Sequence, residues 1–168
     1  LERKTKQPLE VLSQKNFYSS LGMNNTLYNP LTKLDKNHIV PSEIDNYFRH
    51  QVVQGYVHDM AAAMEGGVAG HAGIFSNAID EEKMMQLFLQ KGSYGNKRYF
   101  FFFLFDTFNT SYYAAVGVQR GLGFDKRIAE VGPTCACVSE ASFGHTGFTG
   151  DIAWVDPETD LVYVFLSN

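Results

Sequence analysis

The opening segment carries apolar residues at helical spacing. In "KQPLEVLSQKNFYSSLGM", Leu9, Leu12 and Phe17 fall on one broad helical face, with polar residues between them. Pro8 is typical of a first helical turn and Gly22 of a helix end. The sequence therefore predicts a helix between these two residues.

Two further segments have helix signals at both ends. "HDMAAAMEGG" places Asp59 as an N-cap before an alanine-rich turn and ends with Gly66 and Gly67. "NAIDEEKMMQLFLQKG" begins with Asn77 as an N-cap and ends at Gly92, with acidic residues in its first turn and a lysine in its last. We expect a short helix in the first segment and a longer one in the second.

The spacing of apolar residues changes in the last third of the chain. Apolar runs at Ile152–Val155 and Leu161–Leu166 are joined by the turn-forming residues "DPETD", which predicts a β-hairpin. With Ser142–Phe148 before the hairpin, we expect three consecutive antiparallel strands. Because helices come first and strands last, the predicted class is α+β, with helices packed on an antiparallel sheet.

The composition is that of an ordinary globular chain. Of 168 residues, 45% are hydrophobic and 19% are charged, and the net charge is -4 at pH 7. No basic stripe favours nucleic acid, and the apolar run "YFFFFLF", Tyr99 to Phe105, is too short to span a membrane. That run is β-prone and uncharged, so we expect it to promote aggregation unless it is buried. The opening residues have no apolar stretch typical of an export signal.

The two cysteines, Cys135 and Cys137, are separated by one residue. A bond between them would close a very tight loop, so we expect no structural disulfide. Two cysteines are too few soft ligands for a metal site, and the histidines, at positions 38, 50, 58, 71 and 145, lack metal-ligand spacing. We therefore expect neither a metal nor another cofactor.

Five motifs in order resemble one enzyme family. They are "PLEVLSQKNFYSSLGMNNTLYNP", "GHAGIFSNAID", "RGLGFDK", "FGHTGFTG" and "LVYVFLSN". Together they resemble the beta-lactamase-related, penicillin-recognising serine hydrolases, in particular the class C and DD-peptidase-like branch. That branch includes esterases and a domain sometimes fused behind a glycoside hydrolase. The resemblance covers about residues 9–168 and implies a beta-lactamase/transpeptidase-like fold.

The "HTG" of this sequence is similar to the third catalytic element of that family, on the strand that edges the active site. The resemblance implies that His145 supplies a hydrogen-bond donor and, when protonated, a positive field near the nucleophile. It implies that Thr146 binds a substrate carboxylate and that Gly147 leaves room for a substrate along the strand. It also implies that the backbone N–H of Phe148 is one of two oxyanion donors.

Two motifs of the family have no convincing match in this sequence. No serine is followed three residues later by a lysine, and Ser13 comes nearest, with Lys15 two residues on. The one Tyr-x-Asn match, Tyr94 to Asn96, falls where the family has a variable turn, so we count it as coincidence. In the family both motifs precede the region that this chain resembles. We therefore expect residues 1–168 to be a single partial domain, the C-terminal part of such a hydrolase domain, truncated at its N-terminal side.

Other polar candidates have simpler structural explanations. His71 is more typical of a residue that holds loop backbone by hydrogen bonds than of a cleft residue. His58 and Asp59 are sequence neighbours and do not face each other on a helix, so Asp59 is better explained as a cap. We expect Arg120 and Asp125 to anchor a loop near the cleft, without a catalytic role.

The hairpin aromatics Trp154, Tyr163 and Phe165 alternate with smaller residues. They could line a substrate groove, but core packing is the usual use of aromatic residues on strands. We expect them in the core.

The resemblance implies two functions of different classes. One is part of a serine hydrolase that acts by acyl transfer on a beta-lactam, a D-alanyl peptide or an ester, and that is inactive without the Ser-x-x-Lys nucleophile. The other is a degenerate, non-catalytic module that binds cell-wall-like ligands or packs on a glycoside hydrolase domain. The resemblance also implies a place in the periplasm or on the outer surface of a bacterium. An open sheet edge would invite self-association.

Overall fold

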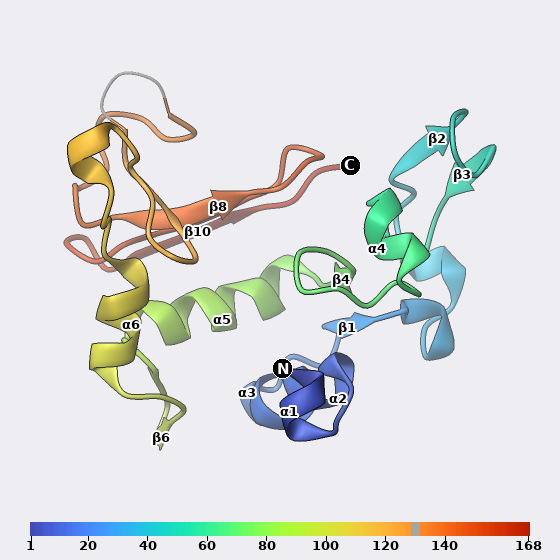
Figure 1. Ribbon diagram of the computed structural model, residues 1–168, viewed down its shortest axis with the longest axis horizontal. Helices are drawn as coiled ribbons and strands as arrows, with labels where there is room; N and C mark the ends of the chain where they lie inside the picture. The colour runs from blue at the N-terminus through green and yellow to red at the C-terminus, as the bar shows by residue number, and fades with distance from the viewer. Residues whose placement is uncertain (129–131) are drawn as a thin grey trace. The chain divides into compact units, whose positions relative to one another are not determined.

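The computed structural model describes residues 1–128 and 132–168 of the chain (Figure 1). The chain divides into two compact units, residues 1–80 together with Asn168, and residues 81–167. The prediction of a single partial domain over residues 1–168 stays a prediction.

The first unit consists of short helices and short paired strands. Its elements are α1 (Glu2–Thr5), α2 (Leu9–Ser13), a π-helical segment (Gln14–Tyr18), α3 (Ser19–Leu21), β1 (Leu27–Tyr28), 3-10 turns (Pro30–Thr32 and Lys36–His38), β2 (Glu43–Asp45), β3 (Gln51–Val53), α4 (Met60–Met64) and β4 (Ile74–Phe75). β1 pairs with β4, and β2 pairs with β3, both antiparallel. The predicted opening helix is confirmed, since helical residues run without a break from α2 to α3 and Gly22 ends them in the left-handed conformation.

Both predicted N-caps are confirmed. The Asp59 carboxylate accepts the Ala62 N–H at 2.7 Å, at the start of α4. The side-chain oxygen of Asn77 accepts an amide N–H in the first turn of α5 (Ala78–Leu89) at 2.9 Å. Gly92 follows α5 with a positive φ of 94°, and its N–H donates to a carbonyl of the last helical turn at 2.9 Å. Such a left-handed residue just beyond the helix satisfies its last carbonyls.

The second unit is built around an antiparallel sheet. Besides most of α5, its elements are β5 (Ser93–Tyr94), β6 (Lys97–Arg98), α6 (Phe102–Asn109), a 3-10 turn (Ala114–Val116), β7 (Asp125–Lys126), β8 (Phe143–Thr146), β9 (Ile152–Asp156) and β10 (Leu161–Phe165). The strand order is β10-β9-β8-β7. The three consecutive antiparallel strands β8, β9 and β10 are therefore confirmed. No helix in the described residues is both long enough and apolar enough to cross a membrane.

Helices α5 and α6 cover one face of this sheet with an apolar core. Phe143 of β8 lies directly opposite Val155 of β9, and both are fully buried. Met85 of α5 and Phe105 of α6 complete the buried cluster. The rings of Phe105 and Phe143 have centroids 5.1 Å apart. The predicted α+β class, with helices packed on an antiparallel sheet, is confirmed.

The hairpin aromatics divide between core and surface. Trp154 is 3% exposed, as expected, but Tyr163 and Phe165 are 49% and 51% exposed, so the core prediction was wrong for these two. Tyr163 lies opposite Trp154 and Phe165 opposite Ile152. Cross-strand partners share a sheet face, which places both on the face away from the Phe143 cluster. Alternation of large and small side chains along a strand shows that the two faces of the sheet differ. It does not show whether other elements of the chain cover each face.

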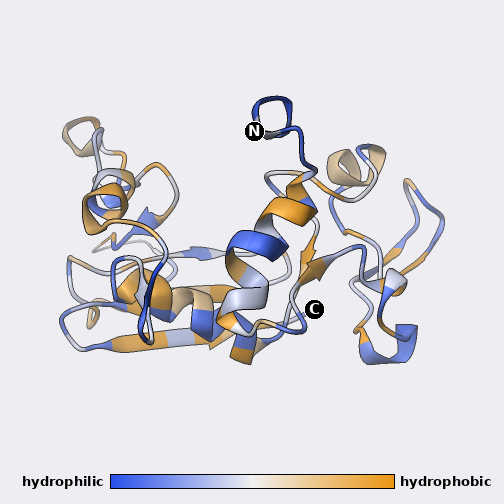
Figure 2. Cartoon of the chain, turned by 90° about the horizontal axis from the view of Figure 1, so that it is seen from below, coloured by the Kyte–Doolittle hydropathy of each residue, from blue (hydrophilic) through white to orange (hydrophobic). Residues whose placement is uncertain are grey.

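The phenylalanine-rich run does not form a strand: its residues from Phe102 onward lie in α6, and Tyr99 to Phe101 precede the helix. α6 begins within this run and is rich in apolar residues, the kind that Figure 2 colours orange. The ring of Phe105 packs against Phe88 of α5 and Phe143 of β8, with centroids 6.2 Å and 5.1 Å away. Packing of this kind overrides the weak intrinsic preference of phenylalanine. Phe101, Phe102 and Phe103 nevertheless remain exposed.

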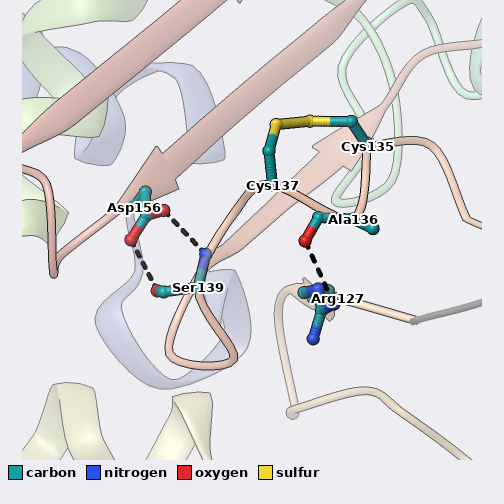
Figure 3. Close-up of a disulfide and its surroundings, with 6 residues drawn as sticks. All are labelled: Arg127, Cys135, Ala136, Cys137, Ser139 and Asp156. Atoms are coloured by element: carbon teal, nitrogen blue, oxygen red, sulfur yellow. Dashed lines mark hydrogen bonds between the residues drawn. A yellow bond between two sulfur atoms is a disulfide. The ribbon is translucent and has the colours of Figure 1, made fainter.

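The cysteines form a disulfide, which corrects the expectation from their spacing (Figure 3). Cys135 and Cys137 lie in a turn of the β7–β8 connection rather than on a strand. Their Cα atoms are 5.3 Å apart, within the usual range for disulfides. The same connection is held to β9 by Ser139, whose N–H and hydroxyl donate to the Asp156 carboxylate at 2.8 Å and 2.5 Å.

Candidate functional site

The candidate site is the C-terminal end of strand β8. β8 pairs with β9 over its whole length, whereas among the described residues β7 pairs only with Phe143 and Gly144. His145 and Thr146 are exposed at the end of the strand. The predicted strand beside the hairpin is confirmed, and His145 is exposed rather than buried in the core; that it faces an open cleft stays a prediction. The strand is shorter than predicted, since it stops before Gly147.

The imidazole of His145 lies between a guanidinium and its own strand. Nη2 of Arg120 donates to Nε2 of His145 at 3.0 Å, and Nδ1 of His145 donates to the Thr146 carbonyl at 2.6 Å. A ring nitrogen that accepts a hydrogen bond carries no proton. This geometry suits the tautomer that carries its proton on Nδ1 and accepts at Nε2.

Arg120 provides the positive charge next to this strand. Its Nη1 donates to Oδ1 of Asp125 at 2.6 Å, and Oδ2 of Asp125 lies 4.0 Å from Nε2 of His145. All three side chains are partly open to solvent, with exposed fractions of 47% for Arg120, 27% for Asp125 and 49% for His145. A charge-assisted network of this kind holds the imidazole in one orientation.

Sequence reasoning expected Arg120 and Asp125 to anchor a loop, and their ion pair does so. It missed that both residues lie next to His145. A signal was present in "RGLGFD", because two glycines between Arg120 and Asp125 favour a tight turn that brings the two side chains together. Asp125 pairs with Gly144, the residue before His145. The local sequence around Arg120 and Asp125 does not predict this pairing.

Gly147 begins a turn that closes on Asp151. The Gly147 N–H donates to the Asp151 carbonyl at 2.8 Å, and the Asp151 carboxylate accepts from the Ser167 N–H at 2.7 Å and the Thr149 hydroxyl at 3.0 Å. A Cβ at position 147 would lie 2.8 Å from a carboxylate oxygen of Asp151. The turn itself therefore requires a glycine here, whatever room Gly147 leaves for a substrate. The side chain of Phe148, at the tip of this turn, is 93% exposed.

Gly144 also has a structural cause. It lies opposite Trp154, and a Cβ at position 144 would collide with the Ala153 carbonyl oxygen and the Trp154 ring. The missing side chain lets the indole cross β8. Gly144 is thus explained by its packing against β9, and Gly147 by the turn that follows β8.

The other polar candidates lie in the first unit. Nε2 of His71 is 3.1 Å from Oδ1 of Asp59, so His71 holds the loop through the α4 cap rather than through backbone groups. Hydrogen bonds from the Ala62 amide and from His71 lower the pKa of Asp59. Nε2 of His58 lies 3.1 Å from Oε1 of Glu43. Among the described residues, no group of three or more His, Cys, Asp or Glu side chains is arranged to hold a metal ion.

Comparison with known proteins gives one consistent family. A family model described as "Beta-lactamase" matches residues 1–168. A protein of Escherichia coli (strain K12) named "Putative D-alanyl-D-alanine carboxypeptidase" is 35% identical over 184 residues, which is 100% of this chain and 42% of that protein. A protein of Bacillus subtilis (strain 168) named "N-acetylmuramyl-L-alanine amidase" is 35% identical over 185 residues, covering 100% of this chain and 41% of that protein.

Solved structures show the same fold. The crystal structure of a beta-lactamase from Mycobacterium bovis superposes with a TM-score of 0.64 at 21% identity, over 99% of this chain and 50% of that chain. The chain thus spans about two-fifths of the curated relatives and half of this solved structure.

Proposed function

Since this chain belongs to the beta-lactamase family, we propose that it supplies the substrate-binding strand of a serine hydrolase that acts by acyl transfer on peptides ending in D-alanine. The observation that carries the proposal is the exposed end of β8, where Arg120 donates to the imidazole of His145 and that ring donates to the Thr146 carbonyl. A D-alanyl peptide is preferred to a lactam or an ester because several relatives carry the name D-alanyl-D-alanine carboxypeptidase.

In this proposal the substrate lies extended along β8 and pairs with its main chain. The Thr146 hydroxyl donates to the terminal carboxylate of the peptide, and Arg120 supplies the opposite charge. When a serine attacks the scissile carbonyl, the Phe148 N–H is one of two donors to the oxyanion. The peptide bond then breaks, D-alanine leaves with a proton, and water later releases the acyl group from the serine.

This sequence has no Ser-x-x-Lys pattern, so the nucleophile must come from a segment outside these 168 residues that carries one. Acyl transfer needs a hydroxyl whose proton is taken by a positioned base, and residues three apart on a helix meet that need. We therefore propose that the 168 residues are inactive alone and active when completed by a segment with that motif.

A chimera tests this proposal. The 168 residues replace the matched segment of a relative that carries Ser-x-x-Lys outside it, and the chimera is incubated with a fluorescent penicillin and weighed intact. We expect a stoichiometric adduct on the chimera and none on the 168-residue chain. An adduct on the chain alone would contradict the external nucleophile, and a folded but unlabelled chimera would contradict the role of β8.

Substitutions in the chimera locate the binding groups. Arg120→Gln and Thr146→Val should each slow acylation about tenfold or more, because each removes a hydrogen bond or a charge from a carboxylate site. The matched control is Arg3→Gln, which removes an exposed arginine of α1 and should leave the rate unchanged. If all three variants were acylated at the same rate, Arg120 and Thr146 would have no role in substrate binding.

A second candidate is a non-catalytic module that binds cell-wall-like ligands along the same strand. The missing Ser-x-x-Lys motif favours it. Calorimetric titration of the 168-residue chain with a D-alanyl-D-alanine peptide distinguishes the two functions. The non-catalytic module is supported if the chain binds the peptide, Thr146→Val abolishes this binding, and the chimera is inactive. A periplasmic or outer-surface location, a neighbouring glycoside hydrolase domain and self-association through the open edge of β10 remain proposals that go with either function.

A further inference from the structure

Helix α6 and the residue before it expose a cluster of apolar side chains, which we name the phenylalanine surface. Its members, Phe101, Phe102, Phe103, Leu104 and Phe108, are between 43% and 63% exposed. The rings of Phe101 and Phe103 stack with centroids 5.7 Å apart, and Phe102 lies edge-on to Phe103 at 6.2 Å. These contacts join Phe101, Phe102 and Phe103 in one aromatic cluster, and exposed apolar clusters of this kind mark interaction sites.

An apolar pocket of about 300 Å³ adjoins this surface. Its wall includes Phe88, Phe100, Leu104, Phe105, Phe108 and Phe124. Because Leu104 and Phe108 belong to both the pocket wall and the phenylalanine surface, apolar lining continues from the surface inward. The region is suited to the chains of a lipid rather than to a polar ligand.

The charges close in sequence to the phenylalanine surface are mainly basic, although the whole chain has a net charge of -4. Within residues 92–119 the charged side chains are Lys97, Arg98 and Asp106. Nζ of Lys91 lies 2.8 Å from Asp106, which offsets the one acid of this stretch. Lys97 and Arg98 are exposed on β6 and make no ion pair in the part of the chain that the structure describes.

We propose that the phenylalanine surface, together with Lys97 and Arg98, binds the surface of an anionic phospholipid bilayer. The phenylalanine rings enter the boundary between headgroups and acyl chains, and the two basic residues contact the headgroup phosphates. A second copy of the chain is a poorer partner, because a symmetric contact would bring the basic residues of both copies together. The proposal is independent of acyl transfer, so either can fail without the other.

Sedimentation with sucrose-loaded vesicles tests it on the 168-residue chain. The chain should pellet with vesicles of phosphatidylcholine and phosphatidylglycerol, and Phe102→Ser with Phe103→Ser should lower the partition coefficient about tenfold or more. Lys97→Gln with Arg98→Gln should remove the preference for these vesicles over phosphatidylcholine alone. The matched control, Tyr163→Ser with Phe165→Ser, removes two similarly exposed aromatics of β10 and should bind as the parent does. No pelleting of the parent, or an equal loss in the control, overturns the proposal.

Fluorescence provides a readout that does not depend on removing apolar residues. Phe103→Trp places an indole on the surface, and lipids brominated in their acyl chains should quench it. The parent, whose one tryptophan, Trp154, is 3% exposed, should not be quenched by the same lipids. If the new indole is also unquenched, the proposal fails. It fails equally if Phe102→Ser with Phe103→Ser turns a dimer into a monomer without vesicles, because a second copy would then be the occupant.

Discussion

The two compact units organise their backbones in different ways. In residues 1–80, carboxylates do much of this work: Asp45 accepts three amide N–H groups at 2.7–3.0 Å, and Asp59 and Asp80 each accept one at 2.7 Å and 2.8 Å. In residues 81–167, strand pairing satisfies much of the backbone, and aromatic side chains pack around Phe143.

The difference follows from how backbone polar groups find partners. Short helices and turns leave many N–H groups without an intrahelical or cross-strand partner, so capping side chains must accept from them. A sheet pairs its own N–H and C=O groups, which leaves the side chains free to build an apolar core. The stability of the first unit should therefore depend more on charged carboxylates, and the stability of the second unit more on the volume of its buried aromatic rings.

Truncating the central ring should have the largest effect. Phe143→Ala removes a fully buried ring next to Phe105 and Phe124, so we expect the free energy of unfolding to fall by about 3–5 kcal/mol. Urea unfolding measures this loss, and hydrogen exchange should locate it in residues 81–167. Val53→Ala, at a fully buried position of the first unit, is the matched change and should cost roughly 2 kcal/mol there. If either substitution lowers protection equally in both units, the units unfold together and the comparison breaks down.

Adding a single methyl group beneath Trp154 should have the next largest effect. Gly144→Ala has no space for its Cβ against the Ala153 carbonyl and the indole, so we expect a loss of about 1–3 kcal/mol from overpacking. The melting temperature should fall, and near-ultraviolet circular dichroism should show a changed environment of Trp154. Gly70→Ala, where a Cβ meets nothing within 4 Å, serves as the control and should leave both signals in place. An unchanged Gly144→Ala protein would mean that β8 and β9 are not packed as described.

Acid should have a smaller effect and should act through a different carboxylate in each unit. Hydrogen bonds from the Phe48 amide, and then from the Tyr47 and Arg49 amides, lower the pKa of Asp45 against the opposing influence of burial. The folded-state pKa is thus below the unfolded value of about 3.9. The stabilisation is present above the unfolded value and is lost as the pH falls through the folded-state pKa.

Asp156 is the counterpart in the second unit. Burial alone would raise its pKa, but hydrogen bonds from the hydroxyl and amide of Ser139 and from the Glu158 amide outweigh burial and lower it. Asp45→Asn should weaken hydrogen-exchange protection in residues 1–80 at pH 7 and reduce its dependence on pH as the pH falls below about 5. Asp156→Asn should do the same in residues 81–167. A pH dependence that neither substitution changes would assign the acid sensitivity to other groups.

Local signals in the sequence determined the helix boundaries and the strand succession. Asp59 and Asn77 cap helices through amides three residues ahead, so the interacting groups belong to one short segment. The β9–β10 hairpin follows from two apolar runs and a turn, which are again local. The family motifs also marked the β8 segment, whose strand is confirmed and whose His145 is exposed. The catalytic roles of His145, Thr146, Gly147 and Phe148 stay predictions.

Only the tertiary structure decided which distant residues meet. Arg120 reaches His145 across 25 positions, because β7 pairs with β8 and carries Asp125 to the same place. The helical form of the phenylalanine-rich run depends on Phe88 and Phe143, which are remote in sequence from α6. The exposure of Tyr163 likewise depends on how one sheet face is covered. Side-chain patterns act over a few residues, whereas these outcomes depend on contacts that exist only after the strands and helices have packed.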